Sequence, residues 1–156
     1  MVRALLEADI PLQAIVITGR NRALRSKLQG LRLGSNRVKI EGFVDDMAVY
    51  LAASDVVVGK AGPASVYEAL AVRRPVLVTS YVGLNERAVA RFVERQGLGH
   101  HVKTPKALLE MTQRYASNPA LLEEVALRCR RLDLEGRTER LAHYLVRYAC
   151  AGTTSA

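Results

Sequence analysis

The chain has 156 residues, of which 49% are hydrophobic and 24% charged, and its formal net charge is +8. This length favours a single domain with its own core, and the absence of an apolar run of about 20 residues excludes a membrane-spanning helix. The two cysteines have no metal-ligand spacing, which indicates a reduced, cytoplasmic setting rather than a disulfide-rich secreted domain.

Basic residues are concentrated between Arg20 and Lys39, where seven arginines and lysines occur without one acidic residue. Such a stretch fits a solvated surface, an anionic membrane, a phosphorylated ligand or nucleic acid. No aromatic residues alternate with these charges, and no zinc-finger, RNA-recognition or helix-turn-helix signature occurs. We therefore expect no nucleic-acid partner, whereas an anionic membrane surface, including a peripheral position at the inner face of a membrane, stays a candidate.

Predicted helices and strands alternate along the chain, as judged from apolar periodicity and from runs of β-branched residues. The predicted helices cover residues 2–9, 22–31, 45–54, 63–74, 85–97, 105–118, 119–132 and 135–151. The predicted strands cover residues 12–19, 37–43, 55–59, 75–81 and 99–103. Asp45 is the expected N-cap of the helix that begins there.

Alternating strands and helices of this kind predict an α/β fold, a Rossmann-like parallel sheet with helices on both faces. A doubly wound nucleotide-binding domain usually opens with a strand and a glycine-rich turn. This sequence opens with the helical pattern of residues 2–9, so we expect that its first strand is missing. Residues 1–150 then form one nucleotide-binding domain, and residues 151–156 form a disordered tail.

Ligands of such sheets bind beyond the carboxyl ends of the strands, and the most informative loop there is "VGKAGPAS", residues 58–65. Gly62 is expected to allow a backbone conformation closed to other residues, and Pro63 suits the first turn of a helix. The free amides of residues 64–66 would then form an anion site, which the helix dipole strengthens. The Lys60 ammonium and the Ser65 hydroxyl add to that site.

Ser65 and Glu68 lie three residues apart, on one face of the predicted helix. A carboxylate at Glu68 can accept hydrogen bonds from two ribose hydroxyls while a diphosphate occupies the amides. The same pair also fits a capping box, with Ser65 as the N-cap.

Two further loops contain polar candidates at strand ends. Asn85 and Glu86 either face the hydroxyls of a sugar or simply cap the helix that starts there. The loop "GFVDDM" can read a base edge through its backbone, although no side-chain signature marks that role. His100 and His101 are interpreted as loop or strand-end residues without a catalytic role.

Three of these motifs, in this order, resemble glycosyltransferase family 28. "ITGRNRAL", "KAGPASVYEA" and "YVGLNE" are similar to the Gly-Arg-Asn, Lys-Ala-Gly-Pro-Gly-Thr-x-x-Glu and Gly-Gln-Glu patterns of its monogalactosyldiacylglycerol and processive diacylglycerol glycosyltransferases. "FVDDM" is similar to a motif of its lipid II UDP-GlcNAc transferase. The resemblance spans about residues 10–100 and implies the C-terminal, donor-binding half of a GT-B fold.

The resemblance also implies roles for individual residues. Val44 would contact uracil through its backbone, Glu68 would hold the ribose, and Gly62, Ala64 and Ser65 would hold the diphosphate. Asn85 and Glu86 would contact the donor sugar or its phosphates, and Arg20 and Asn21 would line the cleft. The sequence departs from the family pattern at Leu84, Asn85 and Ala64, so it leaves the identity of the sugar open.

The implied function is binding of a UDP-sugar donor for transfer of a hexose or N-acetylhexosamine to a lipid such as diacylglycerol. The catalytic base is expected in an N-terminal acceptor domain that this sequence lacks, so the chain alone is expected to be inactive. No metal and no other cofactor are expected, because helix amides and basic side chains stabilise the leaving UDP in this family. The alternatives are a stand-alone donor-binding subunit that needs a partner chain, and half of a UDP-sugar epimerase.

Overall fold

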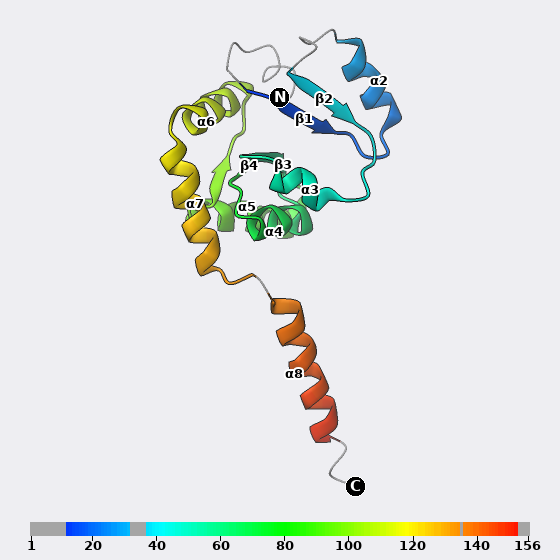
Figure 1. The fold of residues 1–156 in the computed structure, drawn as a ribbon, viewed down its shortest axis with the longest axis vertical. Helices are drawn as coiled ribbons and strands as arrows, with labels where there is room; N and C mark the ends of the chain where they lie inside the picture. Colours follow the sequence, from blue (N-terminus) through cyan, green and yellow to red (C-terminus); the bar gives the residue numbers. More distant parts are fainter. Residues whose placement is uncertain (1–11, 32–36, 135, 153–156) are drawn as a thin grey trace.

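A computed structural model describes residues 12–31, 37–134 and 136–152 (Figure 1). Its strands are β1 (Ala14–Ile17), β2 (Val38–Glu41), β3 (Val57–Lys60), β4 (Val76–Ser80) and β5 (Gly99–His101). Its helices are α2 (Arg22–Gly30), α3 (Met47–Ala52), α4 (Pro63–Ala71), α5 (Gly83–Arg95), α6 (Pro105–Ser117), α7 (Pro119–Arg131) and α8 (Arg137–Gly152). Every element predicted from residue 12 onward is therefore confirmed, whereas the predicted helix over residues 2–9 lies outside the described residues.

All the strand pairs of the described residues are parallel, as predicted. They form two separate sheets, one of β1 and β2 and one in the order β3-β4-β5. The helices follow the strands in strict alternation up to β5, which confirms the α/β class. The described residues contain no pairing between β1 and β3, so the two sheets are not joined by backbone hydrogen bonds.

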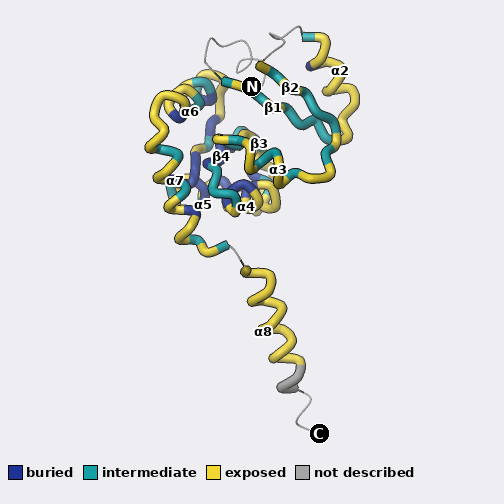
Figure 2. Tube along the Cα trace, in the orientation of Figure 1, coloured by how far each residue is buried: buried dark blue, intermediate teal, exposed yellow. Residues whose placement is uncertain are grey.

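The buried core belongs to the three-stranded sheet and the helices packed on it. Val76, Leu77 and Val78 of β4 are almost completely covered, together with residues of α4 to α7. In the part that contains β1, α2 and β2, the described residues include one buried hydrophobic side chain, Leu28. Figure 2 shows the same division, with intermediate and exposed residues along β1 and β2.

Three helix starts differ from the sequence prediction, and that of α8 lies at Arg137 rather than at residue 135. The N-cap of α3 is Asp46 rather than Asp45, because it is the Asp46 carboxylate that accepts from the Val49 N–H, at 3.4 Å. α5 begins at Gly83, two residues before the predicted start, with Val82 at the N-cap position. These shifts are within the usual uncertainty of a helix boundary read from sequence.

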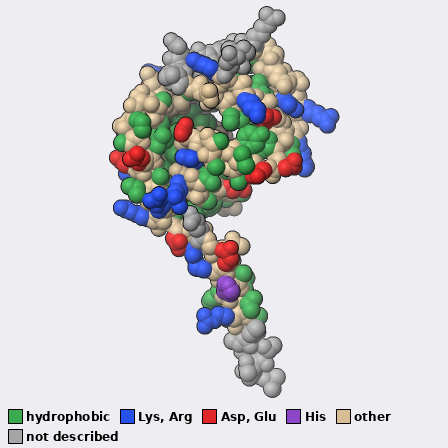
Figure 3. Space-filling view, in the orientation of Figure 1, with side chains coloured by type: hydrophobic (Ala, Val, Ile, Leu, Met, Phe, Trp, Pro, Cys, Tyr) green, Lys and Arg blue, Asp and Glu red, His purple; other side chains and the backbone are tan. Residues whose placement is uncertain are grey.

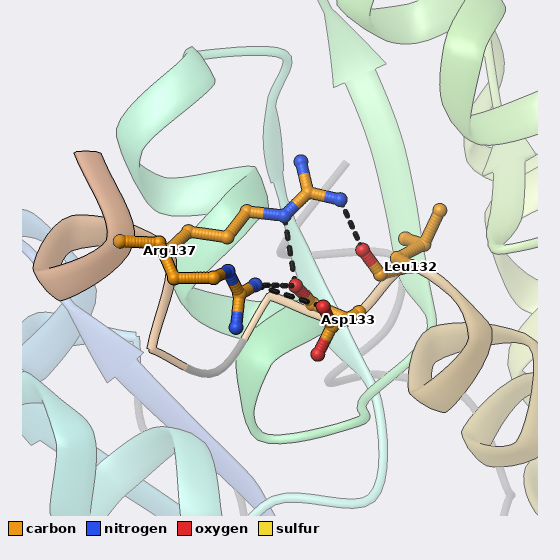
Figure 4. A network of polar contacts seen from close by, with 4 residues as sticks. Leu132, Asp133 and Arg137 are labelled. Carbon is orange, nitrogen blue, oxygen red and sulfur yellow. Dashed lines mark hydrogen bonds and ion pairs between the residues drawn. The ribbon is translucent and has the colours of Figure 1, made fainter. Parts of the chain in front are cut away.

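α8 extends away from the two sheets (Figure 1). A polar network anchors its first turn to the end of α7 (Figure 4): Arg137 donates to the carbonyls of Leu132 and Asp133, and Arg140 forms an ion pair with Asp133, at 2.8 Å. Beyond this turn, its apolar side chains are exposed. α8 ends at Gly152, inside the predicted tail 151–156, and residues 153–156 lie outside the described residues.

Candidate functional site

The amino end of α4 lies directly beyond the carboxyl end of β3. Gly62 is the N-cap and Pro63 the first helical residue, as the sequence indicated. Gly62 has φ −65° and ψ 125°, an ordinary extended conformation, so the prediction of a backbone conformation special to glycine is wrong. The physical reason is Pro63, because the residue before a proline is restricted to extended backbone.

The first turn of α4 presents two backbone amides rather than three. The Val66 N–H donates to the Gly62 carbonyl at 3.0 Å, so it is already used within the helix. Among the described hydrogen bonds, none uses the N–H of Ala64 or Ser65, as expected for the first positions of a helix. These two amides, at the positive end of the helix dipole, can bind an anion.

The position of Ser65 decides between the two interpretations of its spacing from Glu68. Ser65 is the third residue of α4 and Gly62 is the N-cap, so Ser65 does not cap the helix and the capping-box interpretation is wrong. Both side chains are exposed. The Ser65 hydroxyl and the Glu68 carboxylate therefore lie one turn apart on a solvent-facing side of α4. No described hydrogen bond or ion pair uses either group.

An ion pair links the end of β3 to the start of α5. The Lys60 ammonium lies 2.6 Å from Oε1 of Glu86, and Oε2 of Glu86 accepts from the Val82 N–H at 2.7 Å. The Glu86 carboxylate therefore caps α5 from its own first turn, and only 13% of its side chain is exposed. The Lys60 hydrogen bond, followed by that of Val82, lowers the pKa of Glu86 below its ordinary value of 4.5.

This ion pair lies over the amino end of α4. A methyl group placed on Gly62 would be 3.6 Å from Cε and 3.8 Å from Nζ of Lys60, and 4.0 Å from Oε1 of Glu86. A cation and the two amides of Ala64 and Ser65 therefore lie close together at one strand end. Such a cluster can bind a phosphate or diphosphate group.

The sequence did not predict the partnership of Lys60 and Glu86. Opposite charges 26 residues apart carry no local signal. Their positions at the carboxyl ends of neighbouring parallel strands, β3 and β4, would have indicated that they can meet. Asn85 is exposed in the first turn of α5 and is not its N-cap, so its side chain is available to a ligand.

The remaining predicted residues lie at the ends of β1 and β2. Asn21 caps α2, since its Oδ1 accepts from the Leu24 N–H at 2.9 Å. The Arg20 guanidinium lies 4.9 Å from the ring centroid of Phe43, a cation–π contact that the sequence did not predict. Val44 is half-buried in the loop after β2, and no described hydrogen bond uses its backbone. No described hydrogen bond or ion pair joins these residues to α4 or α5.

Within the described residues, no group of three or more His, Cys, Asp or Glu side chains is placed to hold a metal ion. His100 and His101 lie in β5, and the His101 N–H donates to Glu94 at 3.2 Å. Burial lowers the pKa of His100 below 6.5, with a smaller contribution from Arg114 in the same direction. None of the described helices has the length and apolar character needed to cross a bilayer.

Comparison with known proteins places this geometry in context. The sequence model of the glycosyltransferase family 28 C-terminal domain matches residues 2–126. The chain is 32% identical over 96 residues to monogalactosyldiacylglycerol synthase 1, chloroplastic, of Arabidopsis thaliana, a match that covers 62% of this chain and 18% of the synthase. It is 30% identical over 139 residues to the probable monogalactosyldiacylglycerol synthase, chloroplastic, of Glycine max, which covers 86% of this chain and 26% of that protein. The chain thus spans about a quarter or less of these relatives.

Solved structures support the same fold. The glycotransferase of kitacinnamycin superposes with a TM-score of 0.72 at 24% identity, over 93% of this chain and 37% of that chain. At this level of identity the likeness establishes the fold alone, which is that of the C-terminal half of GT-B glycosyltransferases.

Proposed function

Because the chain belongs to the glycosyltransferase family 28 C-terminal domain family, we propose that it binds a UDP-sugar, the donor of a glycosyl transfer, beyond β3 and β4. The observation that carries the proposal is the convergence of the α4 amides, the Lys60 ammonium and the exposed Ser65 and Glu68 side chains at one strand end. Together they offer an anion site with a carboxylate one helical turn behind it.

Each group of the donor has a partner in this arrangement. The diphosphate binds the amides of Ala64 and Ser65, the Ser65 hydroxyl and the Lys60 ammonium. The ribose hydroxyls donate to the Glu68 carboxylate, since a carboxylate is the usual ribose ligand of doubly wound folds. The uracil edge binds the backbone of Val44.

The first turn of α5 faces the sugar. Asn85 contacts its hydroxyls directly. Glu86 already accepts two hydrogen bonds, from Lys60 and from the Val82 N–H, so its role is to hold Lys60 beside the diphosphate. Arg20 and Asn21 lie farther along the strand ends, where Arg20 stacks on Phe43 and Asn21 caps α2, so their contribution to binding is small.

The reaction served by this site is transfer of a hexose or N-acetylhexosamine to a lipid acceptor such as diacylglycerol. The names of the plant relatives support the acceptor class. An acceptor hydroxyl loses its proton to a base outside this chain and attacks C1 of the sugar as the C1–O bond to UDP breaks. The charge that develops on the departing UDP is stabilised by the two α4 amides and Lys60.

Peripheral binding to an anionic membrane belongs to the same proposal. Leu141, Tyr144, Leu145 and Tyr148 form one apolar face of α8, each at least 56% exposed. Arg140, which pairs with Asp133, and Arg147 flank this face. This pattern is typical of a helix that lies in the headgroup region.

A flotation assay tests membrane binding. Vesicles that contain phosphatidylglycerol should carry the chain upward, and pure phosphatidylcholine vesicles should not. Leu145→Asp, on the apolar face, should reduce flotation, whereas Val146→Asp, on the opposite side, should change it little. Equal loss in both variants would contradict a role for the apolar face.

Calorimetric titration tests donor binding, with UDP, UDP-galactose and UDP-N-acetylglucosamine as ligands. Glu68→Ala should weaken UDP binding by about 1.5–3 kcal/mol, the range for a hydrogen bond to a charged group. Glu123→Ala, an exposed carboxylate on α7, serves as the control and should leave the affinity unchanged. Binding that Glu68→Ala does not weaken would contradict the ribose assignment, and a folded chain that binds no UDP would contradict the proposed function.

A further inference from the structure

A cavity lies at the edge of the three-stranded sheet opposite to the donor site proposed above. The donor site is at the carboxyl ends of β3 and β4, whereas this cavity opens beside Gly99, the first residue of β5. Its lining comes from the end of α5, from β5 and from α6 and α7. Its volume is about 270 Å³, just below the range of about 300–1,000 Å³ that holds drug-sized ligands. The cavity therefore suits a smaller molecule.

Tyr115 of α6 contributes a buried hydroxyl to this lining. Only 4% of its surface is exposed, and the hydroxyl has no hydrogen-bond partner among the described residues. The hydroxyl is also not one of their fully covered side-chain atoms, so it is reached from the cavity that Tyr115 lines. Burial raises the pKa of Tyr115 above 10.0, so the hydroxyl keeps its proton and can donate. Since buried donors are normally paired, an acceptor that enters the cavity would satisfy it.

Arg114, one residue before Tyr115, supplies a positive charge. Its side chain forms no ion pair and no hydrogen bond among the described residues. After the larger effect of burial on each ring, the Arg114 charge lowers the pKa of both His100 and Tyr115, so it lies near both. Figure 3 shows Lys and Arg side chains gathered over the lower end of α7, whose last turn contains three arginines. The surroundings of the cavity therefore attract an anion.

The other charged side chains of the lining already have partners. Arg128 donates to the Gly97 carbonyl at 3.0 Å and lies 3.4 Å from a carboxylate oxygen of Glu124. Glu94 accepts from the His101 N–H at 3.2 Å. One guanidinium, that of Arg114, is thus available to a ligand within the described part of the lining.

Apolar side chains form the rest of the cavity wall. Val125 is buried, and Met111 and Leu121 are partly buried against the core. The rings of His100 and Tyr115 lie 6.3 Å apart beside them. A ligand with an apolar body and one charged end would therefore find a partner for each of its parts.

We propose that this cavity binds a small organic carboxylate, whose carboxylate group pairs with Arg114 and accepts from the Tyr115 hydroxyl. Its apolar body packs on Met111 and Val125. An arginine can bind a carboxylate through two parallel hydrogen bonds, which are among the stronger polar contacts of proteins. A monoanion fits one available guanidinium, whereas a phosphate dianion would retain an unpaired charge inside the cavity. The proposal does not depend on the donor site.

An NMR titration of the full chain with benzoate tests the proposal. Benzoate should shift the amide signals of Gly99, His100 and Tyr115 and leave those of Ala64 and Ser65 unchanged. Benzamide has the same shape without the charge and should bind at least about tenfold more weakly. Shifts confined to Ala64 and Ser65, or equal affinities for benzoate and benzamide, would overturn the proposal.

Three variants assign the contacts. Arg114→Gln should weaken benzoate binding at least about tenfold, and Tyr115→Phe, which keeps the buried ring, at least about threefold. Arg91→Gln removes the same charge from an exposed position of α5 outside the lining, so it should leave the affinity unchanged. Circular dichroism checks that each variant is folded. Unchanged affinity in Arg114→Gln or in Tyr115→Phe, or an equal loss in Arg91→Gln, would overturn the proposal.

Two further ligands separate this site from other interpretations. If inorganic phosphate shifts the amides of Gly99 and Tyr115 at a lower concentration than benzoate, the cavity is a phosphate site and the proposal is wrong. UDP should leave these signals and the affinity for benzoate unchanged, because the proposed donor site is at the other edge of the sheet. Displacement of benzoate by UDP would show that the two share one site, and would likewise overturn the proposal.

Discussion

The part built on β3, β4 and β5 and the part built on β1 and β2 share an alternation of strands and helices but differ in burial. Both contain short apolar strands followed by helices. The central strand of the first part, β4, is buried among residues of four helices, whereas the residues of β1 and β2, and of the edge strand β3, are intermediate or exposed (Figure 2). The difference indicates that an apolar strand becomes core only when both of its neighbours are present.

The same comparison separates two kinds of candidate residue. At β3 and β4, Lys60, Gly62 and Glu86 contact one another and the first turn of α4. At β1 and β2, Arg20 and Asn21 contact only their own part among the described hydrogen bonds and ring contacts. The groups proposed to bind an anion therefore lie in the part built on β3, β4 and β5.

The largest expected difference between the parts is at their glycines. Gly99→Ala would place a methyl carbon 1.9 Å from the Val76 carbonyl oxygen, in a backbone with φ +155°. The backbone can relieve neither this clash nor the unfavourable φ by a side-chain movement. We therefore expect β5 to lose its pairing with β4 and the free energy of unfolding to fall by more than about 4 kcal/mol. Gly30→Ala, at the end of α2 in the other part, faces open space and should change stability by less than about 1 kcal/mol. Urea unfolding measures both, and similar costs would contradict the proposed difference in packing.

Truncation of apolar side chains should show a smaller difference in stability between the two parts. Leu77→Ala removes a fully buried side chain of β4 and should cost about 2–4 kcal/mol. Ile15→Ala removes one that is 42% exposed on β1 and should cost less than about 1 kcal/mol. Urea unfolding measures both variants. A large cost for Ile15→Ala would mean that β1 is already packed.

Local sequence was sufficient to predict the elements but not their environment. The β-branched runs predicted every described strand, and Pro63 located the start of α4, because these signals act within a few residues. The same sequence information could not show that the residues of β1 stay partly exposed while those of β4 are buried, since burial depends on residues distant in the chain. The position of the loop after a buried strand indicated the site at α4, and the order of the three motifs supported that interpretation.

The sequence predicted which residues make up the candidate site better than it predicted how they are arranged. Gly62 was expected to have an unusual backbone, but the following proline fixes it as extended. Ser65 had two interpretations because the helix start was uncertain by three residues, and the structure removes one of them. The Lys60–Glu86 pair depends on the register of two neighbouring strands, which no single motif encodes.

Loss of the helix cap at Asn21, in the part built on β1 and β2, is expected to have a moderate effect on stability. Asn21→Ala removes the hydrogen bond to the Leu24 N–H and should destabilise the chain by about 1 kcal/mol, the usual cost of losing an N-cap. Asn21→Asp retains a carboxylate oxygen for the same N–H and should cost much less. Urea unfolding measures the two variants. If they are equally destabilised, the cap is not the reason for Asn21.

The Lys60–Glu86 pair should give the smallest effect, and its pH dependence identifies it. The pKa of Glu86 lies below 4.5 in the folded chain, so the ionised carboxylate stabilises the fold above that pH, and its contribution is lost as the pH falls through the lower folded value. Glu86→Gln should therefore unfold at a lower urea concentration than the parent chain at neutral pH, and the two midpoints should converge once the pH has fallen below the folded pKa of Glu86. Glu123→Gln, on α7, is the control and should follow the parent chain throughout. If the difference between the Glu86→Gln and parent midpoints does not change with pH, the carboxylate acts by its shape rather than by its charge. Its charge then does not hold Lys60 in place.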